Sequence, residues 1–191
     1  MRFFRHRQPL SFLLVLATLF TVFNILPSTQ AADSTAAILS GQTLYTQFSF
    51  FYEKERHLTT NYRQGVLVPV NTEVKLVKMT DRQIVVILPY GQEISVQNVE
   101  DFSGENIDGI FNRTFSKKPV DLSPFTEDEK KAIMTGSVKI GMRRSAVIVA
   151  LGYPPKHKTP GLELNQWRYW QNRFNTFVVV FENDKVKQII N

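Results

Sequence analysis

Cysteine is absent from the 191-residue chain. The protein therefore can form no disulfide bond, and it cannot carry the acylated cysteine that holds bacterial lipoproteins in a membrane. A long apolar run is also missing, because the stretch from Leu10 to Phe23 falls short of the ~20 residues that span a bilayer comfortably. These absences argue against a disulfide framework and against a lipid anchor.

Acidic residues are missing from the first 31 positions, where three arginines precede the apolar stretch and small residues follow it up to Ala31. This order is typical of a cleavable secretory signal. We therefore expect a signal peptide over residues 1–31 and an exported, periplasmic protein that is peripheral at the outer membrane and is not a lipoprotein. A signal that is kept as a membrane anchor is the alternative.

Charge of one sign hardly dominates the exported chain. The full sequence has 23 Lys and Arg against 17 Asp and Glu, but cleavage after Ala31 would remove three arginines and leave 20 basic residues, a formal charge of +3. So weak an excess argues against nucleic acid as a partner. Local basic patches can still meet an anionic lipid or polymer.

Residues 44–99 show the alternation of apolar and polar side chains that is typical of strands. The five short runs cover residues 44–52, 65–70, 73–79, 83–88 and 92–97. Five short strands separated by tight turns predict a small closed β-barrel over residues 40–102. The stretch GVLVPVNTEVKLV, from Gly65 to Val77, resembles the bacterial Src-homology-3-like domains of envelope proteins, which implies the same kind of barrel.

Periodicity fades between residues 103 and 125, so a linker is expected there. After it, Thr126 and Glu129 stand at the spacing of a capping box, which predicts a short helix that Gly136 ends. A second helix is expected from Arg144 to Leu151. Strands over residues 166–170, 176–182 and 185–190 follow. The expected fold class is α+β, a small β-barrel followed by an ααβββ two-layer module of two helices on a three-stranded antiparallel sheet.

The second segment contains IGMRRSAVIVALGYPP, then NQWRYW, then FVVVFENDKV. This ordered combination, over residues 126–191, resembles the SmpA/OmlA, or BamE-like, family of outer-membrane assembly proteins. The resemblance implies a non-catalytic accessory to the machinery that inserts β-barrel proteins into the outer membrane. The chain departs from the family in lacking the lipid-bearing cysteine, in its added N-terminal segment, and in having Arg143 and Ala146 where a hydroxyl cap and an acid are usual.

A catalytic or metal site is not indicated. His57 and His157 stand in no metal-ligand spacing, and we expect them in a solvated turn and in a basic loop. The three successive acids from Glu127 to Glu129 suit a helix start better than paired acid–base work. We therefore expect no enzyme, no cofactor and no metal.

Binding residues are expected in two places of the second segment. Ile148 lies off the apolar stripe of its helix, where it is either covered by another part of the chain or forms a docking surface. The other candidates are aromatic and basic residues, the types enriched at protein interfaces. They are Lys156, His157, Lys158, Arg168, Trp170, Arg173 and Phe174. The alternative for the aromatic residues is that both faces of the strands over 166–170 and 176–182 are buried. The alternative for residues 156–158 is an ordinary solvated loop.

The sequence therefore predicts an envelope protein whose work is binding. The leading hypothesis is an accessory or scaffold factor in outer-membrane protein assembly, with an envelope protein as its partner and weak contact with anionic lipid. The alternative is a periplasmic binding or inhibitor protein that recognises a peptide, a cell-wall polymer or an enzyme through the N-terminal barrel.

Overall fold

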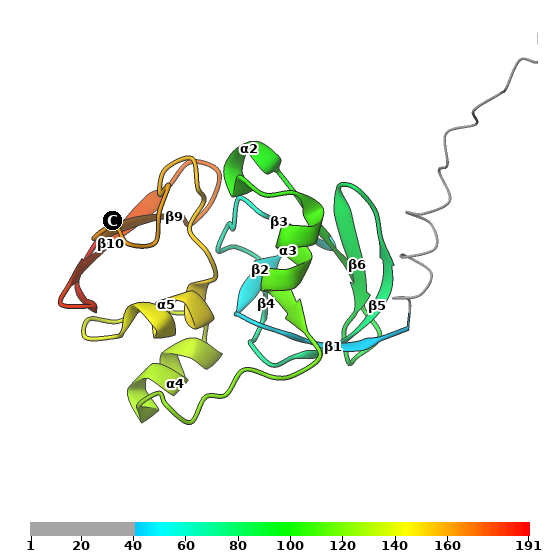
Figure 1. Cartoon of the computed structure of the whole chain (residues 1–191), viewed down its shortest axis with the longest axis horizontal. Coiled ribbons are helices and arrows are strands. Elements are labelled where there is room, and N and C mark those ends of the chain that lie inside the picture. Colours follow the sequence, from blue (N-terminus) through cyan, green and yellow to red (C-terminus); the bar gives the residue numbers. More distant parts are fainter. Residues whose placement is uncertain (1–40) are drawn as a thin grey trace, which may run out of the picture.

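The computed structural model describes residues 41–191 (Figure 1). The expected signal peptide, residues 1–31, lies outside the described residues. The helices are α2 (Glu100–Ser103), α3 (Ile107–Thr114), α4 (Glu127–Met134) and α5 (Arg144–Leu151). The strands are β1 (Thr43–Thr46), β2 (Phe50–Tyr52), β3 (Arg56–Leu58), β4 (Val66–Val68), β5 (Glu73–Met79), β6 (Gln83–Ile87), β7 (Glu93–Gln97), β8 (Phe115–Ser116), β9 (Gln166–Trp170), β10 (Thr176–Glu182) and β11 (Lys185–Ile190).

The largest sheet has six strands in the order β3-β7-β6-β5-β1-β8. Neighbouring strands run antiparallel except β3 and β7, which pair in parallel. A register shift between Leu76 and Lys78 interrupts the pairing of β5 with β6. β2 and β4 form a separate pair, and the last three strands form a third sheet in the order β11-β10-β9.

The fold expected from the sequence is wrong in its architecture. The large sheet is open, with β3 and β8 at its two edges, so the closed barrel over residues 40–102 is not formed. The α+β assignment is also wrong, because the described chain is mostly sheet and only 19% of it is helical. Alternation along a sequence identifies a strand, but it does not say which other strand lies beside it.

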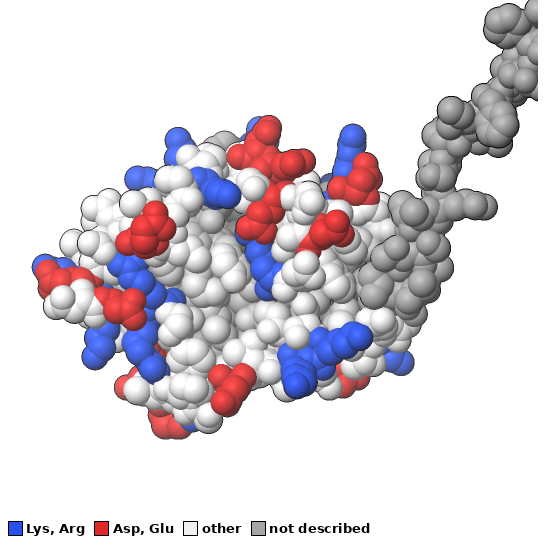
Figure 2. All heavy atoms as spheres, viewed as in Figure 1, with Lys and Arg blue, Asp and Glu red and all other residues white. Residues whose placement is uncertain are grey.

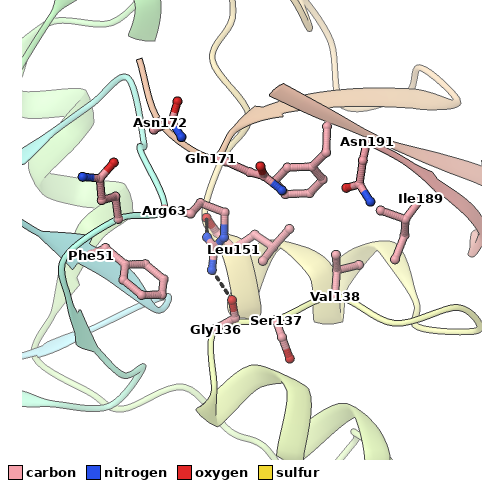
Figure 3. Close-up of a pocket in the computed structure, with 12 residues that line it drawn as sticks. Phe51, Arg63, Gly136, Ser137, Val138, Leu151, Gln171, Asn172, Ile189 and Asn191 are labelled. Carbon is pink, nitrogen blue, oxygen red and sulfur yellow. Dashed lines mark hydrogen bonds between the residues drawn. The ribbon is translucent and has the colours of Figure 1, made fainter. Parts of the chain in front are cut away.

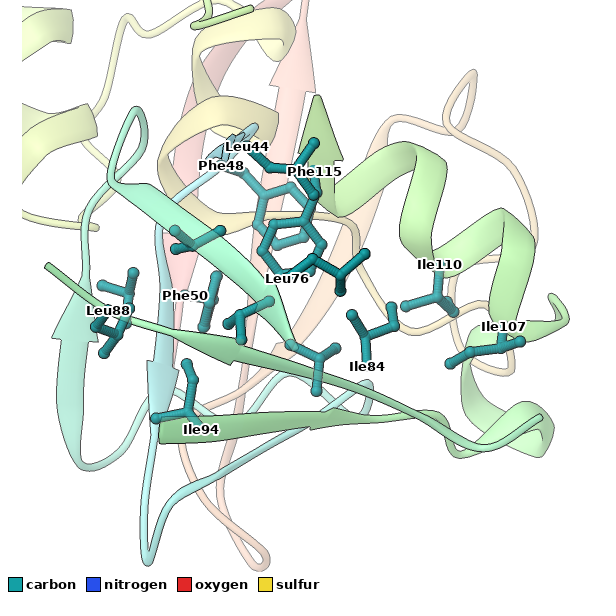
Figure 4. Packing of buried hydrophobic residues seen from close by; sticks show 14 residues of the cluster. Leu44, Phe48, Phe50, Leu76, Ile84, Leu88, Ile94, Ile107, Ile110 and Phe115 are labelled. Carbon is teal, nitrogen blue, oxygen red and sulfur yellow. The ribbon is translucent and has the colours of Figure 1, made fainter. Parts of the chain in front are cut away.

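One core is formed by the large sheet, the β2–β4 pair and α3 (Figure 4). Alternate residues of β5, such as Val74 and Leu76, enter it because successive side chains of a strand face opposite sides. Ile107 and Ile110 are three residues apart in α3, so they share one helix face, and both are buried against the sheet. The segment 103–125, expected as a linker, thus contributes a helix to this core and β8 to the sheet.

A second core gathers residues of α4, α5 and the three-stranded sheet. Trp167 and Tyr169 of β9 are among its fully buried side chains. The expected strands 166–170, 176–182 and 185–190 and the expected helix 144–151 are confirmed with these bounds. The capping box of Thr126 and Glu129 is confirmed as well.

The separate ααβββ module is not seen, although residues 127–190 run in that order of elements. The reason is that the second core is closed by the first half of the chain, since Val70 belongs to it. Ser49 also donates its backbone N–H to the oxygen of Val149 at 2.9 Å and its hydroxyl to the oxygen of Ile133 at 2.8 Å. Figure 1 shows the β2–β4 pair between the large sheet and α5.

The charged side chains on one face of the molecule are shown in Figure 2. Acidic and basic groups are interspersed over that face, so it does not present a broad field of one sign. Among the described helices, none has the length and apolar character needed to cross a membrane.

Candidate functional site

A tight hairpin joins β2 to β3 and carries charged side chains at its tip. Glu53 and Arg56 exchange backbone hydrogen bonds of 3.0 and 3.1 Å across it. Lys54 and Glu55 between them have φ angles of 50° and 62°. Two successive left-handed residues are typical of a type I′ turn, which usually has Asn and Gly at these places. Lys and Glu adopt this conformation at a cost in free energy, and such local strain often occurs at binding sites.

The segment from Asn61 to Arg63 fastens the first half of the chain to the second. The backbone N–H of Arg63 donates to the oxygens of Trp170 and Gln171, both at 3.1 Å, at the end of β9. Asn61, with φ of 55°, donates from Nδ2 to the oxygen of Leu151 at 2.7 Å. Because Leu151 ends α5, this bond satisfies a carbonyl that has no partner within the helix.

The side chain of Arg63 lies where two helices end. Its Nη1 donates to the oxygen of Leu151 at 3.2 Å, and its Nη2 donates to the oxygen of Gly136, just beyond α4. The guanidinium also lies over the ring of Phe51, 5.0 Å from its centre. Burial lowers the pKa of Arg63 to about 10. None of the ion pairs among residues 41–191 includes this guanidinium.

A pocket of about 520 Å³ opens around this guanidinium (Figure 3). We call it the Arg63 pocket. Its apolar lining consists of Phe51, Val138, Leu151, Phe177 and Ile189. Its polar lining consists of Arg63, Gln64, Gly136, Ser137, Gln171, Asn172 and Asn191. In Figure 3, Arg63 lies between Phe51 and Leu151, in the middle of the residues drawn.

A second hollow of about 590 Å³ lies between the β2–β3 hairpin and the loop from β9 to β10. Aromatic and basic side chains make up most of its lining, so we call it the aromatic–cationic groove. The aromatic residues are Phe51, Tyr62 and Phe174, and the basic residues are Lys54, Arg56 and Arg173. Glu53, Leu58, Gln64 and Asn172 complete it. The groove and the Arg63 pocket are adjacent, because Phe51, Gln64 and Asn172 line both.

Two of the residues predicted for binding meet at this groove. Phe174 is 83% exposed, which is unusual for so large an apolar side chain, and Arg173 lies against its ring at 5.8 Å. Trp170 is half-buried, and Thr176 lies opposite it on β10. Arg168 is exposed on the same strand and donates from Nη1 to the hydroxyl of Thr176 at 2.9 Å.

The three basic residues predicted as a loop lie beside α2, outside the lining of the groove. The backbone N–H of Lys156 donates to the oxygen of Phe102 at 2.7 Å. The ring of His157 lies 4.2 Å from that of Phe102 and is stacked at 6.1 Å on that of Trp170. Burial is the larger cause that lowers the pKa of His157, and Lys158 adds to it. The loop is exposed, and its histidine is held between two rings.

Ile148 is half-buried and packs against the second core. The prediction of a solvated turn for His57 is wrong, because that ring is 4% exposed and lies 4.6 Å from the ring of Phe50. Its Nδ1 donates to the oxygen of Phe51 at 2.8 Å, since a carbonyl oxygen can only accept. Burial is the main cause that lowers the pKa of His57 to about 4, so the ring is neutral at pH 7.

Five residues of these two sites are not among the predicted binding residues: Phe51, Lys54, Arg56, Tyr62 and Arg63. The hairpin lies in a polar run between two strands, and Asn61 to Gln64 lies in a stretch with no periodicity. Loops of this kind often carry binding residues, which is the one signal that could have indicated them. Their meeting with Arg173 and Phe174 depends on contacts between distant parts of the chain.

Among residues 41–191, no three His, Asp or Glu side chains lie close enough together to hold a metal ion. No family model, curated protein or solved structure matches the chain. The likeness of the sequence to the BamE-like family and to Src-homology-3-like domains therefore stays a prediction from motifs.

Proposed function

We propose that the protein is a non-catalytic binding protein of the cell envelope that holds an acidic segment of a protein partner in the aromatic–cationic groove. Within the envelope, we propose that it acts as an accessory factor in outer-membrane protein assembly. The observation that carries the binding proposal is the groove itself, whose lining combines three aromatic rings with three basic side chains.

The charge of the groove favours an acidic partner. Lys54, Arg56 and Arg173 face one acid, Glu53, and none of the three takes part in an ion pair among the described residues. Carboxylates of a partner would meet three basic groups that outnumber the one acid of the groove. Such complementarity raises the rate of association and selects against basic partners.

The aromatic rings supply the apolar part of the binding energy. Phe174 is almost fully exposed at the tip of the β9–β10 loop, whereas Phe51 and Tyr62 form half-buried walls below it. Covering a ring of this size excludes much apolar surface from water, and aromatic and arginine residues dominate the energetics of many interfaces. The envelope setting comes from the signal-like N-terminus and from the BamE-like motifs.

A photo-crosslinking experiment tests this proposal in the cell. Phe174 is replaced by a photoreactive phenylalanine analogue, and the membranes are solubilised after irradiation. We expect a crosslinked product that contains an outer-membrane assembly protein. The same replacement at Ile140, which is 72% exposed on the α4–α5 loop, is the control and should give no such product.

A binding assay then tests the chemistry of the groove. The probe is a fluorescent peptide of alternating Asp and Tyr, compared with one in which Asn replaces Asp. We expect Arg173→Glu to weaken binding of the acidic peptide by about tenfold, and the exposed control Lys118→Glu to leave it unchanged. Equal binding of both peptides, or binding only to phosphatidylglycerol vesicles or to isolated cell wall, would contradict an acidic protein segment as the ligand.

A further inference from the structure

The guanidinium of Arg63 has N–H groups that make no hydrogen bond within residues 41–191. Arginine has five N–H donors, and the side chain makes two hydrogen bonds there, from Nη1 to the oxygen of Leu151 and from Nη2 to the oxygen of Gly136. The polar side-chain atoms among these residues that are both buried and unpaired belong to Thr60, Asn61, Trp167 and Trp170. Nε of Arg63 has no partner among these residues and is not one of those atoms, so it is in contact with solvent.

No carboxylate among residues 41–191 forms an ion pair with Arg63. Its pKa falls to about 10 because of burial, an effect that Tyr169 opposes. The two helix ends compensate for part of the charge, since the C-terminus of a helix carries a partial negative charge. They do so through the carbonyl oxygens of Leu151 and Gly136. A planar carboxylate matches two parallel N–H donors of arginine better than a carbonyl does.

The surroundings of Arg63 fit an acid with an apolar body. Phe51 and Phe177 belong to the apolar lining of the pocket. In Figure 3, Phe51 lies on one side of Arg63, and Val138 and Ile189 lie on the other. Its volume of about 520 Å³ falls in the range of small-molecule sites. The rest of its polar rim includes the uncharged side-chain amides of Gln64, Gln171 and Asn172.

Gly136 lets Arg63 come this close to the end of α4. The φ angle of Gly136 is +58°, and a Cβ atom there would stand 3.1 Å from Nη2 of Arg63 and 2.9 Å from Cδ1 of Leu67. A side chain at this position would therefore require Arg63 and Leu67 to shift, in addition to the strain of its own positive φ angle.

We propose that the Arg63 pocket is a second binding site, for a small carboxylic acid with an apolar or aromatic body. The carboxylate accepts hydrogen bonds from the free N–H donors of Arg63, and the body lies against Phe51 and Phe177. This site adjoins the aromatic–cationic groove and shares Phe51 with it. Its anchor is Arg63, which does not line the groove, so the proposal does not depend on an acidic protein segment as the ligand of the groove.

The test compares phenylbutyrate with phenylbutanamide, which has the same body without the charge. Binding to the full exported chain is followed by titration calorimetry and by the NMR signal of the Arg63 Nε–H, assigned by its loss in Arg63→Lys. We expect the acid to bind and shift this signal, and the amide to bind about tenfold more weakly. Binding of the two compounds with equal affinity, an unmoved Arg63 signal, or no binding of the acid at millimolar concentration would overturn the proposal.

A second variant tests the same proposal without replacing Arg63. It is needed because Arg63 also donates to carbonyl oxygens at two helix ends, so its replacement can disturb folding. Gln171→Glu adds a negative charge to the rim with almost no change of shape. We expect this variant to bind phenylbutyrate about tenfold more weakly and to bind phenylbutanamide with unchanged affinity. Gln188→Glu, exposed on β11 and outside the pocket, is the matched control. Arg173→Glu, which tests the groove, should not alter phenylbutyrate binding, so the two proposals can fail separately.

Discussion

Arg143 binds the carboxylate of Glu129 and so joins the starts of two helices. Nε and Nη2 of Arg143 donate to the two carboxylate oxygens at 3.1 and 2.7 Å, and its backbone N–H donates at 2.9 Å. The same carboxylate accepts the backbone N–H of Thr126 at 3.0 Å, which closes the capping box of α4. Arg143 is the N-cap residue of α5, and its side chain takes no part in capping that helix. One buried carboxylate thus serves α4 and fixes the start of α5.

We expect Glu129→Gln to lower the free energy of unfolding by about 2 kcal/mol, because it weakens a cap and several hydrogen bonds to a charged group. Urea denaturation at pH 7 measures this. Glu127→Gln is the control, since Glu127 is exposed and pairs with Lys130 at the surface, and it should leave stability unchanged.

The hydrogen bonds from Arg143 are the first cause that lowers the pKa of Glu129 to about 2. The contribution of Glu129 to the free energy of unfolding is therefore present above pH 4.5 and is lost as the pH falls through 2.

His57 should make the protein less stable in mild acid. Its pKa is about 4 in the folded state, chiefly because of burial, with Arg113 and Arg63 adding smaller effects, against 6.5 in the unfolded chain. The unfolded state therefore binds more protons between these values, so stability is fully present above pH 6.5 and falls as the pH drops towards 4. At pH 5 the loss is about 2 kcal/mol.

Denaturation of the wild-type chain at pH 7 and pH 5 checks this expectation. His57→Gln keeps a donor for the oxygen of Phe51 but does not titrate, so its stability should change less between the two pH values. An equal change in both proteins would show that another group is responsible.

The β2–β3 turn should gain stability from glycine. Glu55 has φ of 62°, so Glu55→Gly removes the strain of a side chain in the left-handed region, and we expect a gain of about 0.5–1 kcal/mol. Glu93→Gly in the strand β7 is the control and should destabilise, because glycine loses more conformational entropy there. Thermal unfolding should show a higher midpoint temperature for Glu55→Gly and a lower one for Glu93→Gly than for the wild-type chain.

Gly152 should not tolerate alanine. Its φ angle is +74°, and a Cβ atom would stand 2.7 and 2.8 Å from two ring carbons of Phe48, a member of the first core. We expect Gly152→Ala to cost about 3 kcal/mol, from backbone strain and from displacement of that ring. Gly91→Ala isolates the backbone part, because Gly91 has φ of +86° with nothing within 4 Å, and it should cost about 1 kcal/mol. Denaturant midpoints of the two variants should therefore differ clearly.

The elements of the second segment could be predicted because their signals are local. The capping box at Thr126, the helix stop at Gly152 and the strands that follow each depend on a few neighbouring residues, and the structure has them where they were expected. Arg173 and Phe174 were found as binding candidates for a similar reason, since aromatic and arginine residues in a loop are an interface signal in any fold.

Local signals could not show that the barrel stays open or that the second segment is not a separate module. β8 pairs with β1 although about 70 residues separate Phe115 from Thr46, and β3 pairs with β7 in parallel, a partnership that alternation does not encode. His57 looked like part of a solvated turn because its neighbours from Glu53 to Arg56 are charged, yet its ring is buried against Phe50.

The bounds of the helices and strands in the second segment can be derived from local sequence, since caps, turns and periodicity act over a few residues. Long-range packing instead sets which strands pair, joins the halves of the chain in one core, and places Arg63 at the ends of two helices. The groove and the Arg63 pocket belong to this second group. The physical reason is that each combines side chains from residues 51–64 with side chains of the β9–β10 loop, which more than 100 residues separate and only long-range packing brings together.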